Sequence, residues 1–199
     1  MKNIITQYTG LNKSIYYLIF ARTVISLGDF SYALITLYLT LKLNITAAEA
    51  GIFLTIAALV TAPSSWLGGY LSDQFGRKKV ILIGQYLNGF VFLITLFFHN
   101  SIVVVYLLII ALFFISLTRT SYISMIVELI TGDQERKKGF SLLYLGINVG
   151  AGIGPLVTGI FFVEYIEYVL IGIVISNIIS TLIIQFFVYE TLNKIILKE

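Results

Sequence analysis

Long apolar runs separated by short polar segments dominate this chain of 199 residues. A helix that crosses the roughly 30 Å hydrocarbon core of a bilayer needs about 20 mostly apolar residues. Six runs reach that length, at residues 14–41, 48–71, 80–98, 102–130, 139–163 and 168–189. The runs are continuous rather than alternating, which favours helices over a barrel, because backbone in lipid must be hydrogen-bonded internally. The pattern predicts an all-α membrane protein with residues 1–199 in one domain of six transmembrane helices.

Composition and charge placement support a membrane protein and predict its orientation. The chain is 58% hydrophobic and 12% charged, with a mean hydropathy of +0.96. The first run contains Arg22 and Asp29 and has no small-residue cleavage site, so we interpret it as a retained span rather than a signal peptide. Basic residues concentrate in the end segments and the even-numbered connections: Lys2, Lys13, Arg77, Lys78, Lys79, Arg136, Lys137, Lys138, Lys194 and Lys198. The odd-numbered connections hold only Lys42, so we expect cytoplasmic termini and a cell-membrane location.

Residue types that support catalysis or metal binding are scarce. The chain has no cysteine, and its one histidine, His99, lies in a short predicted turn where we expect a solvated loop residue. The sequence has no group of residues typical of a catalytic, metal or cofactor site, so an enzyme is not predicted. The net charge of +3 follows from the membrane topology and does not call for a nucleic-acid partner.

One polar interruption, "GGYLSDQFGRKKVIL" at residues 68–82, has a spacing of its own. Gly69, Asp73 and Arg77 recur every four residues, so they share a face if the preceding helix continues through them. We expect Gly69 to permit close approach of a neighbouring backbone and Gly76 to turn the chain. Asp73 could accept hydrogen bonds from the N-terminal amides of an opposing helix.

These residues resemble a motif of the major facilitator superfamily, G-x-x-x-D-x-x-G-R-[KR]-[KR], which follows the second span in that family. A second segment, "GINVGAGIGPLVTGIFF", is similar to the family's antiporter motif G-x-x-x-G-P-x-x-G-G. It matches through Gly150, Gly154, Pro155 and Gly159, and departs at Thr158, where the motif has glycine. The resemblance implies the N-terminal half of a twelve-helix transporter, close to the drug:proton antiporter branch.

Two residues of the run 102–130 extend the resemblance. Arg119 lies well inside the apolar run, where a charge costs at least roughly 2.5–3.5 kcal/mol, so it needs a partner or a wet cavity. In drug:proton antiporters an arginine near this point is associated with proton coupling. Glu128 resembles the family's acidic residue that pairs with the motif arginine. The resemblance therefore implies an Asp73–Arg77–Glu128 network that acts as a conformational latch.

Asp29 is the candidate for a carboxylate that gains and loses a proton during transport. At helical rise it lies about 22 Å into the first span, and Arg119 lies about 17 Å from the inner end of its own span, so the two could meet across a cavity. Burial favours the neutral acid and the guanidinium favours the carboxylate. A fixed structural ion pair is the alternative, and Arg22 is an alternative partner. Weaker candidates for the cavity lining are Asn148, Asn88 and Gln85.

A short internal similarity bears on the arrangement of the helices. "ARTVIS" around Arg22 and "TRTSYIS" around Arg119 are 97 residues apart, in helices predicted to run in opposite directions. This arrangement is typical of a 3+3 inverted-topology repeat.

Three functions fit these observations. The first is secondary transport, as proton-linked efflux of small amphipathic compounds, by this half paired with a second copy of itself or with a separate C-terminal half. The second is a non-transporting half or interaction module, and the third is a facilitator of sugars or organic ions without proton coupling. The expected partners are the lipid bilayer, a small-molecule substrate and protons. In a two-fold pair, we expect Asp73 to lie near residues 139–141 of the other copy, with Gly69, Gly150 and Gly154 at the contact.

Overall fold

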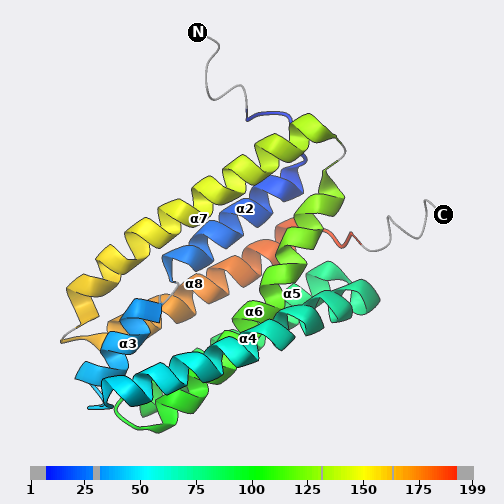
Figure 1. Cartoon of the computed structure of the whole chain (residues 1–199). Helices are drawn as coiled ribbons and strands as arrows, with labels where there is room; N and C mark the ends of the chain where they lie inside the picture. Colours follow the sequence, from blue (N-terminus) through cyan, green and yellow to red (C-terminus); the bar gives the residue numbers. More distant parts are fainter. Residues whose placement is uncertain (1–7, 29–31, 131, 163, 192–199) are drawn as a thin grey trace.

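A computed structural model describes residues 8–28, 32–130, 132–162 and 164–191 of the chain. Within these ranges the chain forms seven α-helices (Figure 1). They are α2 (Lys13–Leu27), α3 (Tyr32–Leu41), α4 (Ala47–Phe75), α5 (Arg77–Phe98), α6 (Val103–Leu129), α7 (Asp133–Phe162) and α8 (Ile166–Phe187).

Five of the described helices, α4 to α8, are long and apolar enough to cross a membrane. They correspond to the second to sixth predicted spans. The first predicted span, 14–41, contains two helices instead of one. Gly28 ends α2, and its backbone N–H bonds the Ile25 and Ser26 carbonyls. At 15 and 10 residues, α2 and α3 are each shorter than the roughly 20 residues that a bilayer requires. The sixth span and the inverted repeat therefore stay predictions.

Local sequence sets both ends of α4. Thr46 caps its first turn in a capping box with Glu49, so two unpaired backbone N–H groups are satisfied. The helix runs past the predicted end at residue 71 to Phe75. Gly76 then adopts φ +106°, a conformation that glycine reaches without steric cost, and α5 begins at the next residue. Gly76 turns the chain here as the sequence predicted.

The helices pack pairwise, with small residues where they approach most closely. Helix α6 packs against α4 and α5, α8 packs against α2 and α5, and α7 packs against α2 (Figure 1). The close α4–α6 contact is at Gly68, where a Cβ would overlap the Leu117 carbonyl. Gly69 does not make this contact, and its expected close approach to the backbone of another bundle stays a prediction. A Cβ at Gly69 would lie 3.5 Å from Thr120 Cγ2, which is ordinary contact.

Glycines of α7 face α2 of the same chain. A Cβ at Gly150 would overlap Ser26, and one at Gly154 would lie 2.7 Å from the Leu27 carbonyl oxygen. Gly146 makes the same kind of contact one turn earlier, where sequence reasoning did not assign a role. These glycines let two helices of one bundle approach closely, so they are not free to contact a second copy, which corrects that part of the expected two-fold pairing.

A layer of buried polar side chains separates two apolar clusters. One cluster gathers on α3, α4, α5, α6 and α8 around Leu39, Phe53 and Leu170. The other gathers on α2, α5, α6, α7 and α8 around Leu18, Met125 and Ile184. The intervening layer comes from α5, α6 and α8: Gln85, Asn88, Thr118, Ser121, Asn177, Ser180 and Thr181. Buried polar groups at this depth point to a site rather than to packing alone.

Candidate functional site

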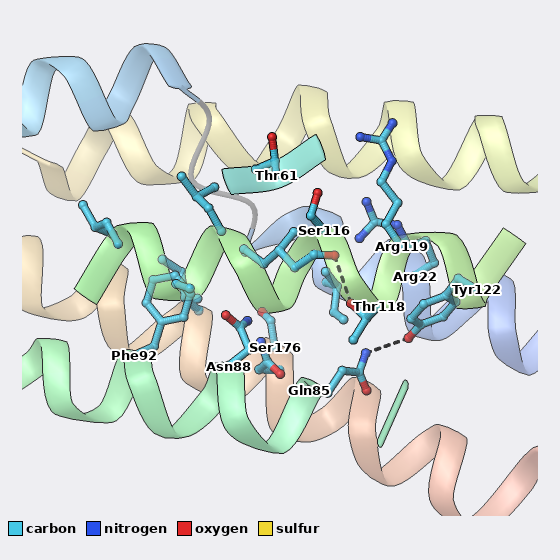
Figure 2. Close-up of a pocket in the computed structure, with 18 of the residues that line it drawn as sticks. Arg22, Thr61, Gln85, Asn88, Phe92, Ser116, Thr118, Arg119, Tyr122 and Ser176 are labelled. Carbon is cyan, nitrogen blue, oxygen red and sulfur yellow. Dashed lines mark hydrogen bonds between the residues drawn. The ribbon is translucent and has the colours of Figure 1, made fainter. Parts of the chain in front are cut away.

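A cavity of about 320 Å³ lies at the level of this polar layer. Helices α2 to α8 all contribute to its lining, and Figure 2 shows the cavity from one side. The polar lining residues are Arg22, Thr61, Gln85, Asn88, Ser116, Thr118, Arg119, Tyr122, Ser176 and Asn177. Phe92, Leu108 and Leu112 contribute apolar surface. The volume and the mixed lining suit a small amphipathic molecule.

The two arginines that sequence reasoning singled out both line this cavity. Figure 2 shows Arg22 and Arg119 at the same end of the cavity as Tyr122. Arg119 is exposed, although it lies well inside the apolar helix α6. Within the described residues it makes no hydrogen bond or ion pair. Asp29, its predicted partner, lies outside the described residues.

Two of the three weaker candidates, Gln85 and Asn88, are buried cavity residues. The Gln85 amide donates to Tyr122 Oη (2.7 Å) and Ser180 Oγ (3.2 Å) and accepts from Thr181 Oγ1 (3.1 Å). It therefore joins α5, α6 and α8 in a satisfied network. The third candidate, Asn148, is exposed and donates to the Tyr144 carbonyl of its own helix (2.7 Å), away from the cavity lining.

Asn88 and Asn177 differ from Gln85 because part of each amide is unsatisfied. Each side chain is 5% exposed, and both line the cavity. The side-chain carbonyl oxygens Asn88 Oδ1 and Asn177 Oδ1 are buried and have no hydrogen-bond partner. An unsatisfied buried polar group costs about 1–3 kcal/mol, so such groups are rare outside functional sites. The only sequence signal for Asn177 was an asparagine inside an apolar run.

The residues of the predicted latch come together at one end of the bundle, here called the charged end and defined by Asp73, Arg77 and Glu128. Arg77 Nη2 lies 2.8 Å from Glu128 Oε1, and Nε donates to the same oxygen at 2.9 Å. Arg77 also forms an ion pair with Asp73 and donates to Ser72 Oγ (2.7 Å). Arg77 and Glu128 are 11% and 14% exposed, whereas Asp73 is 64% exposed. The Arg77–Glu128 pair is thus the shielded part of the network.

A segment after α8 also reaches the charged end, which sequence reasoning missed. The Glu190 carboxylate accepts from the backbone N–H groups of Lys78 and Lys79 (3.3 Å each), in the first turn of α5. Thr191 donates its hydroxyl to Glu128. Glu190 thus lies at the N-terminus of α5, where a carboxylate is favoured by the helix dipole. The expectation that Asp73 lies near residues 139–141 of a second copy stays a prediction. The sequence signal that could have identified Glu190 is its position as an acid directly after the last apolar run, 168–189.

The opposite end of the bundle corrects the expectation for His99. Its side chain is 19% exposed, with Nε2 2.8 Å from Glu167 Oε1 and Nδ1 2.7 Å from the Leu96 carbonyl. Tyr38 also donates to its backbone carbonyl. His99 therefore joins α3, α5 and α8 instead of lying free in a loop.

Membrane-length helices around a polar cavity at mid-depth are the arrangement of a membrane transporter. A family model of the Major Facilitator Superfamily matches residues 18–195. The chain belongs to this superfamily of transporters.

Similarity to individual proteins agrees with the family. The chain is 26% identical over 159 residues to a protein of Planococcus maritimus named a Na(+), Li(+), K(+)/H(+) antiporter, covering 75% of this chain and 36% of that one. It is 29% identical over 169 residues to the uncharacterized MFS-type transporter YqjV of Bacillus subtilis (strain 168), covering 79% and 40%. The chain thus spans less than half the length of these relatives.

Solved structures show the same fold. The crystal structure of a peptide transporter, POT, in complex with sulfate matches with a TM-score of 0.80 at 18% identity, covering 96% of this chain and 42% of that one. A bacterial homologue of the iron transporter ferroportin, in its outward-facing state, matches with a TM-score of 0.77 at 17% identity, covering 92% and 46%. At these identities the likeness concerns the fold alone.

Proposed function

We propose that this chain forms one half of a secondary transporter that moves small amphipathic compounds out of the cell by alternating access, linked to protons. Exposure of Arg119 deep inside an apolar helix is the observation that carries this proposal. Sixteen residues separate it from Val103 and ten from Leu129, which correspond to about 24 Å and 15 Å of helix. A charge facing lipid at such depth costs at least roughly 2.5–3.5 kcal/mol.

The exposed Arg119 is therefore expected to face water in a cavity that a second bundle encloses. The chain covers 36% and 40% of two curated relatives, which supports a further bundle in the working assembly. That bundle is a second copy of this chain or a C-terminal half. Substrate then passes between the two bundles, because opening the contact at one end while closing it at the other exposes the cavity to alternate sides.

Proton coupling is proposed to involve Asp29, with Arg119 and Arg22 as the cations that set its charge state. Both arginines line the cavity. Protonation of Asp29 would remove the negative charge that the two arginines face. A proton on Asp29 would therefore change how strongly Arg22 and Arg119 bind a charged substrate, which couples the two binding events. The name of the Planococcus maritimus relative, an antiporter that exchanges cations for protons, is consistent with such coupling.

The charged end is proposed to be the cytoplasmic latch. Its basic residues Arg77, Lys78 and Lys79 lie where the positive-inside rule places the cytoplasm. Glu128 and Glu190, from α6 and the segment after α8, hold the first turn of α5. Such a network stabilises one arrangement of the helices, and movement of the second bundle against it would favour another.

Transport is tested with the purified 199-residue chain in liposomes that carry an imposed pH gradient. Two radiolabelled probes are followed in parallel, the amphipathic cation ethidium and the organic anion 3-phenyllactate. Gradient-driven accumulation of either probe above protein-free liposomes supports the proposal. If neither probe moves although the chain is inserted and folded, secondary transport by this chain alone or with itself is contradicted.

Asp29→Asn tests the coupling in the same liposomes. The variant should lose gradient-driven accumulation while exchange of probe without a gradient continues. The matched control is Glu164→Gln, which removes an exposed acid remote from the cavity lining. Unchanged gradient dependence in Asp29→Asn would exclude Asp29 as the coupled carboxylate and would favour an uncoupled facilitator.

Self-pairing is tested with cysteines in this cysteine-free chain. Gln74 and Ser141 are exposed and lie near the two surfaces predicted to meet, whereas Ser72 is fully buried and unsuitable. Membranes that contain Gln74→Cys and Ser141→Cys copies together should give an oxidative crosslink between copies. If both cysteines react with maleimide but yield no crosslink, the second bundle is not a second copy of this chain.

A further inference from the structure

We propose that the cavity binds an amphipathic organic anion that also carries a hydroxyl or amino group. Arg119 binds the anionic group, the Asn88 and Asn177 side-chain carbonyls accept hydrogen bonds from the donor group, and the apolar lining takes the hydrocarbon part. The inference rests on the proposed function, because it names the substrate class of the same cavity.

The charge of the lining favours an anion. Among the described residues, the cavity lining includes two arginines and neither aspartate nor glutamate. Arg119 makes no hydrogen bond or ion pair among the described residues, so an anionic ligand group would give this cation a counter-charge in a site of low dielectric. A guanidinium binds a carboxylate through two parallel hydrogen bonds, which a lysine cannot reproduce.

The two asparagines add a requirement for a hydrogen-bond donor. A side-chain carbonyl oxygen only accepts hydrogen bonds, and both Asn88 Oδ1 and Asn177 Oδ1 are buried without a partner. Asn177 Oδ1 lies 3.9 Å from the position of a Cβ at Gly89, so this carbonyl lies against α5 next to Asn88. A ligand hydroxyl or ammonium at this point would satisfy groups that the protein leaves unpaired, which gives strong selection against ligands that lack a donor.

The order of these groups along the cavity defines the shape of the ligand. Figure 2 shows Arg119 towards one end, Asn88 and Ser176 in the middle and Phe92 towards the other end. On α6, Arg119 is separated from the lining residues Leu112 and Leu108 by about 10 Å and 16 Å of helix. The ligand therefore carries its anionic group at one end, its donor near the middle and an apolar group at the other end.

Binding is tested by calorimetry with the purified chain in phosphatidylcholine nanodiscs, with empty nanodiscs as the blank. Three probes share one phenyl group: 3-phenyllactate has a carboxylate and a hydroxyl, 3-phenylpropionate lacks the hydroxyl, and 3-phenylpropylamine is a cation. We expect the lactate to bind best, the propionate about 3- to 10-fold more weakly, and the amine at least about 10-fold more weakly than the lactate. Equal or tighter binding of the amine overturns the inference, as does absence of binding of both acids at millimolar concentration.

Three variants assign the contacts. Arg119→Gln should weaken both acids by about 10- to 100-fold, whereas Arg119→Lys keeps the charge and should retain the preference for acids over the amine. Asn88→Leu should weaken the lactate to the level of the propionate and leave the propionate unchanged. Unchanged acid binding in Arg119→Gln, or equal losses for both acids in Asn88→Leu, contradicts the assignment. Circular dichroism and gel filtration show that each variant is folded.

The proposed ligand class and the proposed transport can be contradicted independently of each other. The calorimetry uses no gradient and needs no second bundle that moves, so selective binding of acids without accumulation in liposomes supports the ligand class and contradicts transport. Gradient-driven accumulation of ethidium with no binding of either acid supports transport and contradicts the ligand class.

Discussion

Arg77 and Arg119 are both arginines of membrane-length helices, but their surroundings differ. Arg77 at the charged end contacts Glu128, Asp73 and Ser72 and is 11% exposed. Arg119 in the cavity is exposed and has no hydrogen bond or ion pair among the described residues. The partners of Arg77 stabilise one arrangement of the helices, whereas Arg119, which has no partner among the described residues, is the proposed contact for Asp29 and for an anionic ligand group.

The same contrast holds for other hydrogen-bonding groups at the two places. At the charged end, Glu190 and Thr191 satisfy backbone N–H groups of α5 and the second oxygen of Glu128. In the cavity, Asn88 and Asn177 keep a buried carbonyl oxygen unpaired. Polar groups at the charged end are therefore paired, whereas at mid-depth Gln85 is paired and Asn88 Oδ1 and Asn177 Oδ1 have no partner among the described residues. Variants at both places test this division.

The largest effect is expected from Arg77→Gln. This change leaves the mostly buried Glu128 without its cation, and we expect a loss of about 3 kcal/mol in the free energy of unfolding. Unfolding by dodecyl sulfate in mixed micelles, followed by far-ultraviolet circular dichroism, measures it. The triple variant Asp73→Asn, Arg77→Gln, Glu128→Gln should lose less, because it has no uncompensated charge. Equal losses in the two variants would show that the three residues act independently.

Gly68→Ala is expected to have the next largest effect. Its Cβ would overlap the Leu117 carbonyl and force α4 away from α6, so a loss of about 2 kcal/mol is expected. Gly69→Ala is the matched control, since its Cβ would lie 3.5 Å from Thr120 and change stability by less than about 0.5 kcal/mol. The same unfolding assay compares them. A larger loss at Gly69 would place the critical helix contact on the other residue.

Glu190→Gln is expected to lower the free energy of unfolding by about 1 kcal/mol. The carboxylate accepts from two backbone N–H groups in the first turn of α5, where negative charge is favoured. Glu164→Gln, at an exposed acid outside the charged end, should change stability very little. Salt should reduce the difference between the two variants, and a salt-independent difference would speak against an electrostatic origin.

The smallest effect on stability is expected from Arg119→Gln. Because Arg119 has no partner among the described residues, its removal should change the free energy of unfolding by less than about 0.5 kcal/mol, or increase it. Binding of 3-phenyllactate should fall in the same variant. A loss of stability as large as that of Arg77→Gln would make Arg119 a structural charge and would remove the contrast between the two regions.

Much of the architecture was accessible from periodicity and composition. The apolar runs at 48–71, 80–98, 102–130, 139–163 and 168–189 predicted helices that the structure contains, because runs of this length have few alternatives in lipid. The turn at Gly76 was predictable for the same kind of reason, since glycine reaches a positive φ at no steric cost. The break between α2 and α3 was not predicted, because residues 14–41 are apolar throughout except for scattered polar side chains.

The amino-acid sequence alone indicated the membrane class, the family and the motif residues Asp73, Arg77 and Glu128, since these follow from local patterns of a few residues. Tertiary structure decided which helix ends meet and which polar groups find partners. It placed Glu190 at the first turn of α5, Gly68 at Leu117, and the glycines of α7 against α2. It also left Asn177 Oδ1 unpaired beside α5, while Gln85 found three partners. These outcomes depend on the rotation and crossing of whole helices, and shifting a helix by one residue turns it by about 100°, which no pattern within a single helix records.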